Sequence, residues 1–270
     1  MNDNYKTPVI SVLLCVYNPD KRQLYEAVNS IIEQSFLQWE MILYDDGSKE
    51  PEKEWIYKMS CLDTRIRYVR NETHFSLAHG LNESMKLALG KYLARMDADD
   101  ISHPKRFEKQ LEFLEKNPQF MWVGSNINLM DDKGEKWGER KYPQCPGAKE
   151  FLKYSPYAHP SIMIHREKLM AYGGYKTGEH PYRSEDYELF MRLQAAGEQG
   201  MNLQENLLDY RESIKGYQKR TLKFQFQEML VRWEGFKSLR ILNINTWIYV
   251  VKPMIVWAIP DKLIYAIKRR

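Results

Sequence analysis

The stretch "YLARMDADDISHP" at residues 92–104 passes from apolar and small residues into three acids within four positions. Its first half is typical of a buried strand, and Asp97, Asp99 and Asp100 crowd together where that strand would end. Like charges at this spacing repel each other, so we expect a positive group among them. The neighbouring segments indicate what fold would hold such a cluster.

Strand-like and helix-like segments alternate from residue 8 to residue 130. The predicted strands are short runs of apolar and β-branched residues, at 8–18, 39–48, 66–71, 91–96 and 120–130. Predicted helices fill the intervals and begin near Asp20, Pro51, Leu77 and Pro104. Four such alternations predict an α/β fold with a mostly parallel central sheet flanked by helices.

Three of the predicted strand ends carry polar groups. These groups are Tyr17-Asn18, Asp45-Asp46, and Asp97 through Asp100. In sheets of this kind, ligands bind beyond the carboxyl ends of the strands. We therefore expect the three groups to line one crevice, provided that their strands are neighbours.

The pattern loosens after residue 130. Residues 131–147 have the composition of a loop. A helix is predicted over 184–197, with Ser184 as its cap and Gly197 as its end. Residues 207–213 are expected to form a short last strand.

Composition excludes several classes of protein. The 270 residues include 40 basic and 36 acidic side chains, and a net charge of +4 is too mild to indicate a nucleic-acid partner. The three cysteines are far apart and form no CxxC pair, which argues against a disulfide framework or a zinc site and fits a reducing compartment. The polar N-terminus predicts no secretory signal.

The acidic cluster at 97–100 suits a hard divalent cation such as Mg²⁺ or Mn²⁺, because these ions prefer carboxylate oxygens. Such an ion would also remove the repulsion between the acids. The alternative is that the acids cap the helix predicted near Pro104, whose N-terminus favours anions. One cap needs fewer than three acids, so the metal is the preferred interpretation.

Four motifs in order, "ISVLLCVYN", "YDDGS", "ARMDADD" and "SEDYELFMRL", resemble the family 2 glycosyltransferases with the GT-A fold. The resemblance covers residues 8 to about 212. It implies a GT-A domain over 1–215, with a Rossmann-like, nucleotide-sugar-binding half at 8–100 and an acceptor-binding, catalytic half at 101–215. Residues 216–270 would form a helical C-terminal tail.

The resemblance also implies how the donor is held. Asp99 would ligate a Mn²⁺ or Mg²⁺ ion on the donor's diphosphate, and Asp97 would lie beside the metal or contact the ribose. Asp46 would accept a hydrogen bond from the N3–H of uracil, since a carboxylate complements an imide N–H. Tyr17 and Cys15 would pack against the base, although Cys15 is equally well explained as a small core residue. For Asp45 we prefer a turn cap over Gly47.

The "ED" pair would supply the catalytic base. Asp186 matches that role and Glu185 lies on the acceptor side, although both acids would also start a helix well. Many relatives carry a metal-binding histidine after a "YR" pair, whereas this chain has Glu212 and Ser213 there. The third metal ligand is therefore left open. His159 and His165 are expected to be structural.

The expected activity is inverting, metal-dependent transfer of a hexosyl or N-acetylhexosaminyl group from a UDP-sugar to a hydroxyl of a glycan or lipid-linked glycan, in surface polysaccharide or lipopolysaccharide biosynthesis. One alternative is a sugar-phosphate nucleotidyltransferase, but "YNPDKRQ" lacks the glycine-rich loop that such an enzyme would carry. An oxidoreductase would need GxGxxG there. The other alternative is a non-catalytic nucleotide-sugar-binding protein, against which the retained Asp97, Asp99 and Asp186 argue.

The tail segment "TWIYVVKPMIVWAIPDKLIYAIKRR" at 246–270 is rich in aromatic and aliphatic residues. Its uninterrupted apolar stretches are shorter than the ~20 residues of a spanning helix. Aromatic side chains beside basic ones suit a membrane interface, so we expect membrane-surface contact through 244–270 at the inner face of the cytoplasmic membrane. The alternative is a helix packed on the core or on a partner subunit. The oligomeric state is left open.

Overall fold

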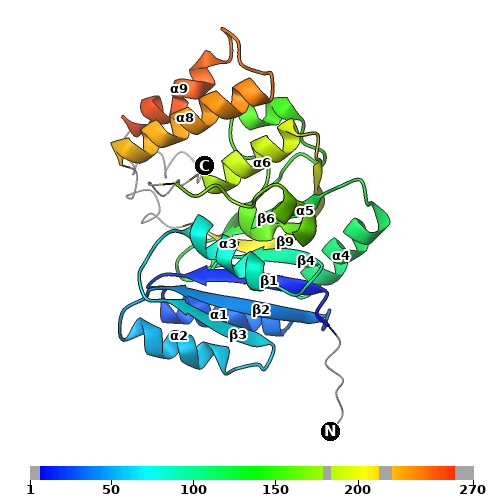
Figure 1. Ribbon diagram of the computed structural model, residues 1–270, viewed down its shortest axis with the longest axis vertical. Helices are drawn as coiled ribbons and strands as arrows, with labels where there is room; N and C mark the ends of the chain where they lie inside the picture. Colours follow the sequence, from blue (N-terminus) through cyan, green and yellow to red (C-terminus); the bar gives the residue numbers. More distant parts are fainter. Residues whose placement is uncertain (1–6, 179–183, 213–220, 259–270) are drawn as a thin grey trace.

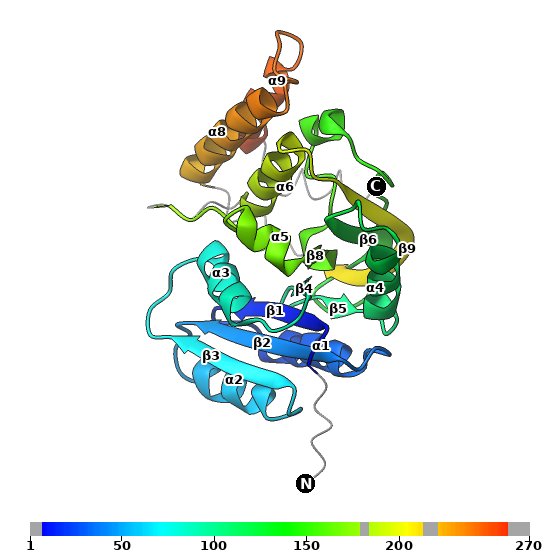
Figure 2. The same cartoon turned by 45° about the vertical axis from the view of Figure 1, so that its right-hand side comes forward.

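The computed structural model describes residues 7–178, 184–212 and 221–258 (Figure 1). In these ranges the strands form one sheet in the order β3-β2-β1-β4-β8-β6-β9-β5, and β7 pairs with β6 outside this path. Helices cover both faces of the sheet (Figures 1 and 2). The α/β architecture with a largely parallel, curled sheet is the one predicted from the alternation of segments.

The N-terminal part of the sheet is parallel throughout. Its strands are β1 (Ile10–Val16), β2 (Trp39–Asp46), β3 (Ile66–Asn71) and β4 (Tyr92–Met96). The register pairs Val16 with Asp45, Asp46 with Asn71, and Leu14 with Met96, so the carboxyl ends of all four strands meet at one edge. This alignment brings together the three polar strand ends expected to form a crevice.

The connecting helices are α1 (Lys21–Ile32), α2 (Glu52–Ser60) and α3 (Leu77–Leu87). The Asp20 side chain caps α1 by accepting a hydrogen bond of 3.0 Å from the Gln23 N–H, as the sequence predicted. Apolar side chains of α1 and α2 pack on one face of the sheet with those of α4 (Arg106–Lys116). Those of α3 pack on the other face, together with α5 (Arg166–Ala171), α6 (Glu185–Ala195) and the C-terminal helices.

The C-terminal part of the sheet is mixed. β8 (Met163–His165) lies antiparallel between β4 and β6 (Trp122–Met130), and β9 (Gly200–Arg211) runs parallel to β6. The two-residue β5 (Ile101–Ser102) pairs with β9. Two short 3-10 helices complete this part, at Ala148–Leu152 and His159–Ser161.

Two predictions about this part were wrong. Residues 131–147 are not only a loop, because β7 (Lys136–Arg140) forms a hairpin with β6 through a turn at Gly134, whose φ is +90°. Most β7 side chains are exposed, so the strand lacks the apolar alternation by which sequence patterns identify strands. The strand expected at 207–213 is the longer β9, whose first half carries polar side chains; residue 213 lies outside the described ranges.

The tail is helical where it is described. α8 (Leu222–Ser238) and α9 (Trp247–Trp257) lie side by side at the end of the molecule farthest from β3 and α2 (Figures 1 and 2). Val231 and Phe236 of α8 and Val250 of α9 are buried in the core cluster that includes α6. Over the ranges that the structure covers, every helix is too short or too polar to cross a bilayer.

Candidate functional site

Two hollows lie along the edge where the parallel strands end. The larger is a cleft of about 730 Å³ lined by Asp97, Glu185 and Asp186 among others. The smaller has a volume of about 500 Å³ and is lined by Tyr17, residues 47–50 and His74 among others. Of the predicted site residues, Asp97, Glu185 and Asp186 line the larger hollow and Tyr17 lines the smaller, whereas the side chains of Cys15, Asp46 and Asp99 line neither.

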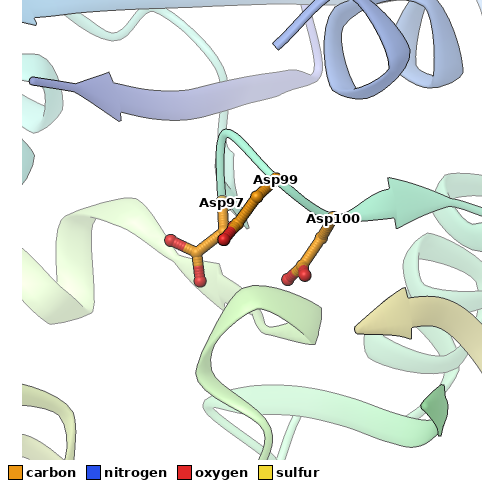
Figure 3. Close-up of side chains that lie close together, drawn as sticks. All are labelled: Asp97, Asp99 and Asp100. Atoms are coloured by element: carbon orange, nitrogen blue, oxygen red, sulfur yellow. The ribbon is translucent and has the colours of Figure 1, made fainter. Parts of the chain in front are cut away.

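The acidic cluster lies in the loop between β4 and β5. Asp97, Asp99 and Asp100 each place one carboxylate oxygen within 4.8 Å of the others. Figure 3 shows the three side chains pointing to the same side of this loop. Restricted hydration of its carboxylate and, next to it, the Asp97 charge raise the pKa of Asp99 to about 6; the second of these causes is the repulsion that the sequence predicted.

Arg95 supplies the positive group expected among these acids. It is only 5% exposed, and its Nη1 forms an ion pair with an oxygen of Asp97. Although burial opposes the charge, Asp97 raises the pKa of Arg95 above its usual value. Sequence reasoning missed this residue. A signal was available, because a charged side chain inside a buried strand needs a partner.

Asp100 has a structural role. It is fully buried, and its Oδ1 accepts a hydrogen bond of 2.8 Å from the backbone N–H of Arg211 on β9. The Arg211 Nε donates to the backbone oxygen of Asp99 at 2.8 Å. The acidic loop is thus fixed to the end of β9 from both sides.

The donor set of this cluster fits a divalent cation. Asp97 is partly exposed, Asp99 is exposed, and Asp100 keeps one buried oxygen, Oδ2, with no hydrogen-bond partner. Carboxylate oxygens at this spacing are the ligands that Mg²⁺ and Mn²⁺ prefer. The capping alternative is wrong, because α4 begins at Arg106 with Lys105 at its N-cap and no side-chain cap bond.

Glu185 and Asp186 form the first turn of α6 and face the cleft that Asp97 also lines. Ser184 occupies the N-cap position but makes no side-chain cap bond. Burial raises the pKa of Glu185 to about 7 and that of Asp186 to about 6, with Asp97 adding to both shifts and Arg95 opposing them. The pKa of Asp186 therefore lies closer to neutral pH than that of an ordinary aspartate.

The rest of the cleft is lined by aromatic and basic side chains. Tyr142, Tyr154 and Tyr157 contribute rings, and Arg140, Lys153 and Lys252 contribute positive charge. Lys252 comes from α9, so the tail forms part of the cleft wall. Rings and donors of this kind suit the faces and hydroxyls of a sugar.

The histidines have the structural roles expected of them. His159 is buried at the cleft wall, where its Nε2 lies 2.8 Å from the Tyr175 hydroxyl. Burial holds the pKa of His159 well below its usual value, so the ring is neutral. The ring of His165 packs on Tyr92, with 4.6 Å between the ring centroids.

Glu212, which stands where many relatives carry a metal-binding histidine, pairs with Arg140 at 3.3 Å.

Beside the smaller hollow, the buried Asp46 is bound by the protein itself. Its carboxylate accepts hydrogen bonds from the Phe75 N–H at 3.1 Å and from Asn71 Nδ2 at 3.3 Å, and it lies 2.8 Å from His74 Nδ1. His74 stacks on Tyr17 with 3.8 Å between the ring centroids, and both rings are exposed. No local pattern singles out His74, because its partners Tyr17 and Asp46 lie far away in the chain.

Asp45 and Cys15 lie away from both hollows. Asp45 is fully buried and accepts a hydrogen bond of 2.8 Å from the Ser48 N–H across Gly47, which confirms the expected turn cap. Cys15 packs against α3, with its Sγ 3.7 Å from the Ser84 hydroxyl. Burial raises the pKa of the Cys15 thiol to about 12. This position favours the core role over contact with a base.

Comparisons with known proteins agree on one family. The model described as Glycosyl transferase family 2 matches residues 11–176. EpsE of Bacillus subtilis (strain 168) is 33% identical over 249 residues, which cover 92% of this chain and 88% of EpsE. An Escherichia coli protein named UDP-Gal:alpha-D-GlcNAc-diphosphoundecaprenol beta-1,3-galactosyltransferase is 29% identical over 262 residues, covering 90% of this chain and 91% of that protein.

Among solved structures, S. aureus TarS (residues 1–349) is similar with a TM-score of 0.66 at 16% sequence identity. The match covers 92% of this chain and 72% of the TarS chain. At this identity the likeness concerns the fold alone, which is the GT-A arrangement expected from the motifs.

Proposed function

The chain belongs to glycosyltransferase family 2, and we propose that it transfers a sugar from a UDP-sugar to an acceptor hydroxyl with inversion at the anomeric carbon. It is a glycosyltransferase with the GT-A fold. The observation that carries the proposal is the cleft shared by Asp97, from the acidic cluster, and Asp186, from the "ED" pair. A donor-binding acid and a candidate base thus face one space.

In the proposed reaction, Asp186 accepts the proton of the acceptor hydroxyl while that oxygen forms a bond to the anomeric carbon. The bond from the anomeric carbon to the diphosphate oxygen breaks at the same time, and the electron pair leaves with UDP. A single displacement inverts the configuration. A pKa of about 6 leaves Asp186 mainly ionised at neutral pH and still basic enough to take the proton.

Asp97 and Asp99 would hold the divalent cation, and Asp100 would keep their loop on β9. These residues would place the cation where it could neutralise the negative charge that builds on the departing diphosphate. Arg95, buried behind Asp97, would hold that carboxylate in place. Mg²⁺ and Mn²⁺ both suit the oxygen ligands.

The proposed base site is the smaller hollow. Both oxygens of Asp46 already have protein partners, so a uracil N3–H would replace one of these. Among the partners of Asp46, His74 has a side chain that is exposed at the surface. Its ring also stacks on that of Tyr17. We therefore assign the uracil to the place beside Tyr17 that His74 occupies. Residues 8–100 would bind the nucleotide sugar and 101–215 the acceptor.

The acceptor proposed is a hydroxyl of a lipid-linked glycan in surface polysaccharide biosynthesis. The support is the name of the Escherichia coli relative, which specifies a diphosphoundecaprenol-linked sugar. The basic and aromatic wall of the cleft is consistent with a sugar that carries a diphosphate nearby. The free cysteines Cys15, Cys61 and Cys145 fit a cytoplasmic setting for this reaction.

The proposal is tested by incubating the protein with a panel of UDP-, GDP- and TDP-sugars and measuring nucleotide diphosphate release with and without Mn²⁺. Because water can replace the acceptor, we expect UDP release from a UDP-sugar without any added acceptor. This release should occur only when Mn²⁺ is present. Release from a GDP- or TDP-sugar alone would overturn the donor assignment. Binding of UDP-sugars without release, even with undecaprenyl-diphosphate-linked acceptors added, would favour a non-catalytic binder.

A further inference from the structure

One face of α8 carries a stripe of exposed apolar side chains. Leu222, Phe226, Leu230 and Trp233 are between 39% and 49% exposed. Their spacing of four, four and three residues places them on one side of the helix. Val231, on the opposite side, is buried against the core, as is Phe236 in the last turn of the helix. The stripe is therefore not needed for packing within the described part of the chain.

The stripe continues onto α9. Trp233 and Trp247 are in contact, with 4.9 Å between their ring centroids. Ile248 and Ile255 of α9 are 55% and 50% exposed, whereas Val250 and Pro253 are buried. The two helices lie side by side in both views of the molecule (Figures 1 and 2). Together these side chains form the tail face, defined as Leu222, Phe226, Leu230, Trp233, Trp247, Ile248 and Ile255.

In the described part of the chain, basic residues lie at one end of the tail face. Lys237 and Arg240 are exposed at the end of α8, where the acid Glu234 is also exposed. Glu228, the other acid of α8, pairs with Arg232 at 2.9 Å. In the sequence, residues 213–220 before α8 contain three basic residues and no acid, and residues 259–270 after α9 contain four basic residues and one acid.

Exposed apolar side chains together with basic residues indicate what covers the tail face. Tryptophan, leucine and isoleucine beside lysine and arginine suit the boundary between acyl chains and anionic headgroups. A protein partner would not require the excess of basic residues that the sequence carries before α8 and after α9. We infer that the tail face lies on the surface of an anionic phospholipid bilayer. The sequence-based expectation assigned this contact to 244–270, whereas four of the seven side chains belong to α8, and residues 259–270 lie outside the described ranges.

The same helix connects the tail face to the cleft. Lys252 of α9 lines the cleft and donates a hydrogen bond of 2.7 Å to the Lys153 carbonyl. An acceptor anchored in the bilayer would therefore reach the cleft beside the surface that holds the protein. Only this last step rests on the proposed function, because lipid binding requires no donor and no turnover.

The test is flotation of the full chain with vesicles of phosphatidylglycerol and phosphatidylcholine in equal parts, compared with vesicles of phosphatidylcholine alone. We expect the wild type to float with the mixed vesicles and Leu230→Glu or Phe226→Glu to reduce the bound fraction roughly tenfold. Leu37→Glu is the matched control, since Leu37 is 67% exposed and lies outside the tail face. Circular dichroism checks the fold of each variant.

Several results would overturn the inference. The first is that the wild type does not float with the mixed vesicles. The second is that Leu230→Glu floats as much as the wild type, and the third is that the wild type binds equally to both kinds of vesicle. Light scattering tests a further outcome that would overturn the inference. If the wild type is a dimer that does not bind vesicles, and Leu230→Glu is a monomer, the tail face binds a second copy of the chain. Donor hydrolysis measured without vesicles should be the same in Leu230→Glu and wild type, so failure here is distinct from failure of the transferase proposal.

Discussion

Arg95 and Asp97 form an ion pair at the end of β4, with Met96 between them in the chain. Because Arg95 is buried and Asp97 lines the cleft, the pair connects the core of the sheet to the site. Arg95 also limits the rise in the pKa values of Asp99, Glu185 and Asp186. One buried cation thus compensates acids from two distant segments of the chain.

Replacing Arg95 with methionine should make stability depend on metal. Arg95→Met removes the positive charge among the acids at similar side-chain length, so their repulsion is no longer compensated. We expect a lower melting temperature in EDTA and a larger rise on adding Mn²⁺ than in the wild type, because the ion replaces the missing charge. Thermal unfolding with and without Mn²⁺ measures both. An equal Mn²⁺ effect in the two proteins would refute this role.

Asp99→Asn should abolish the Mn²⁺-dependent part of UDP binding. The substitution keeps the size of the side chain and removes one charged ligand from the proposed cation site. Isothermal titration of UDP in the presence of Mn²⁺ should show affinity reduced to the level that the wild type has in EDTA. Asp132→Asn, an exposed position outside the cleft, is the control. Unchanged titration of Asp99→Asn would remove it from the metal site.

The activity should show an acidic limb set by Asp186. A base must be deprotonated to accept the proton, and the pKa of Asp186 is about 6. We expect kcat/KM for UDP release to fall roughly tenfold per pH unit below about 6 and to level off above it. Rates in buffers of constant ionic strength measure the limb. A profile that stays flat well below pH 6 would show that the base is another group.

Asp209 should contribute stability that acid removes. Although burial acts against ionisation, contacts with His103, Asn128 and Lys136 lower the pKa of Asp209 to about 2. The unfolded chain therefore binds this proton at higher pH than the folded chain, and the stabilisation is present above about pH 4 and lost toward pH 2. Asp209→Asn should cost about 2 kcal/mol at neutral pH.

Urea unfolding across this pH range tests the Asp209 prediction. The difference between wild type and Asp209→Asn should shrink as the pH falls below about 4. Asp63→Asn is a useful comparison, because Asp63 also pairs with a basic side chain, that of Arg65, but lies far from this network in the chain. A difference that stays constant with pH would contradict a role for the Asp209 charge.

The sequence predicted the parallel half of the fold well. Strands β1, β2 and β4 are mainly apolar runs bounded by turn residues, and their burial on both faces produces this pattern, whereas β3 at the sheet edge is only partly buried. β5 and β7 escaped notice because one has two residues and the other is largely exposed. The stripe on α8 was missed for a related reason: Gln225 and Gln227 are buried while Phe226 between them is exposed, which reverses the usual relation of polarity to burial.

The sequence also identified most of the acids at the site but few of their partners. Asp97 and Asp99 stood out because a cluster of charges at a strand end is visible in a local pattern, whereas Asp186 was singled out only by the resemblance to the family's motifs. Arg95 and His74 depend on contacts that only the folded chain creates. The second oxygen of Asp100 illustrates the same limit, since its burial follows from β9, more than a hundred residues away.

The anomeric configuration of the first sugar released tests the central claim most directly. Proton NMR of UDP-α-sugar hydrolysis, with Mg²⁺ in place of the paramagnetic Mn²⁺, resolves the two anomers before they equilibrate. A single displacement assisted by Asp186 predicts the β-anomer first from the wild type and a rate that is lower by about 10² to 10⁴ in Asp186→Asn. Initial release of the α-anomer, or wild-type rates in Asp186→Asn, would contradict it.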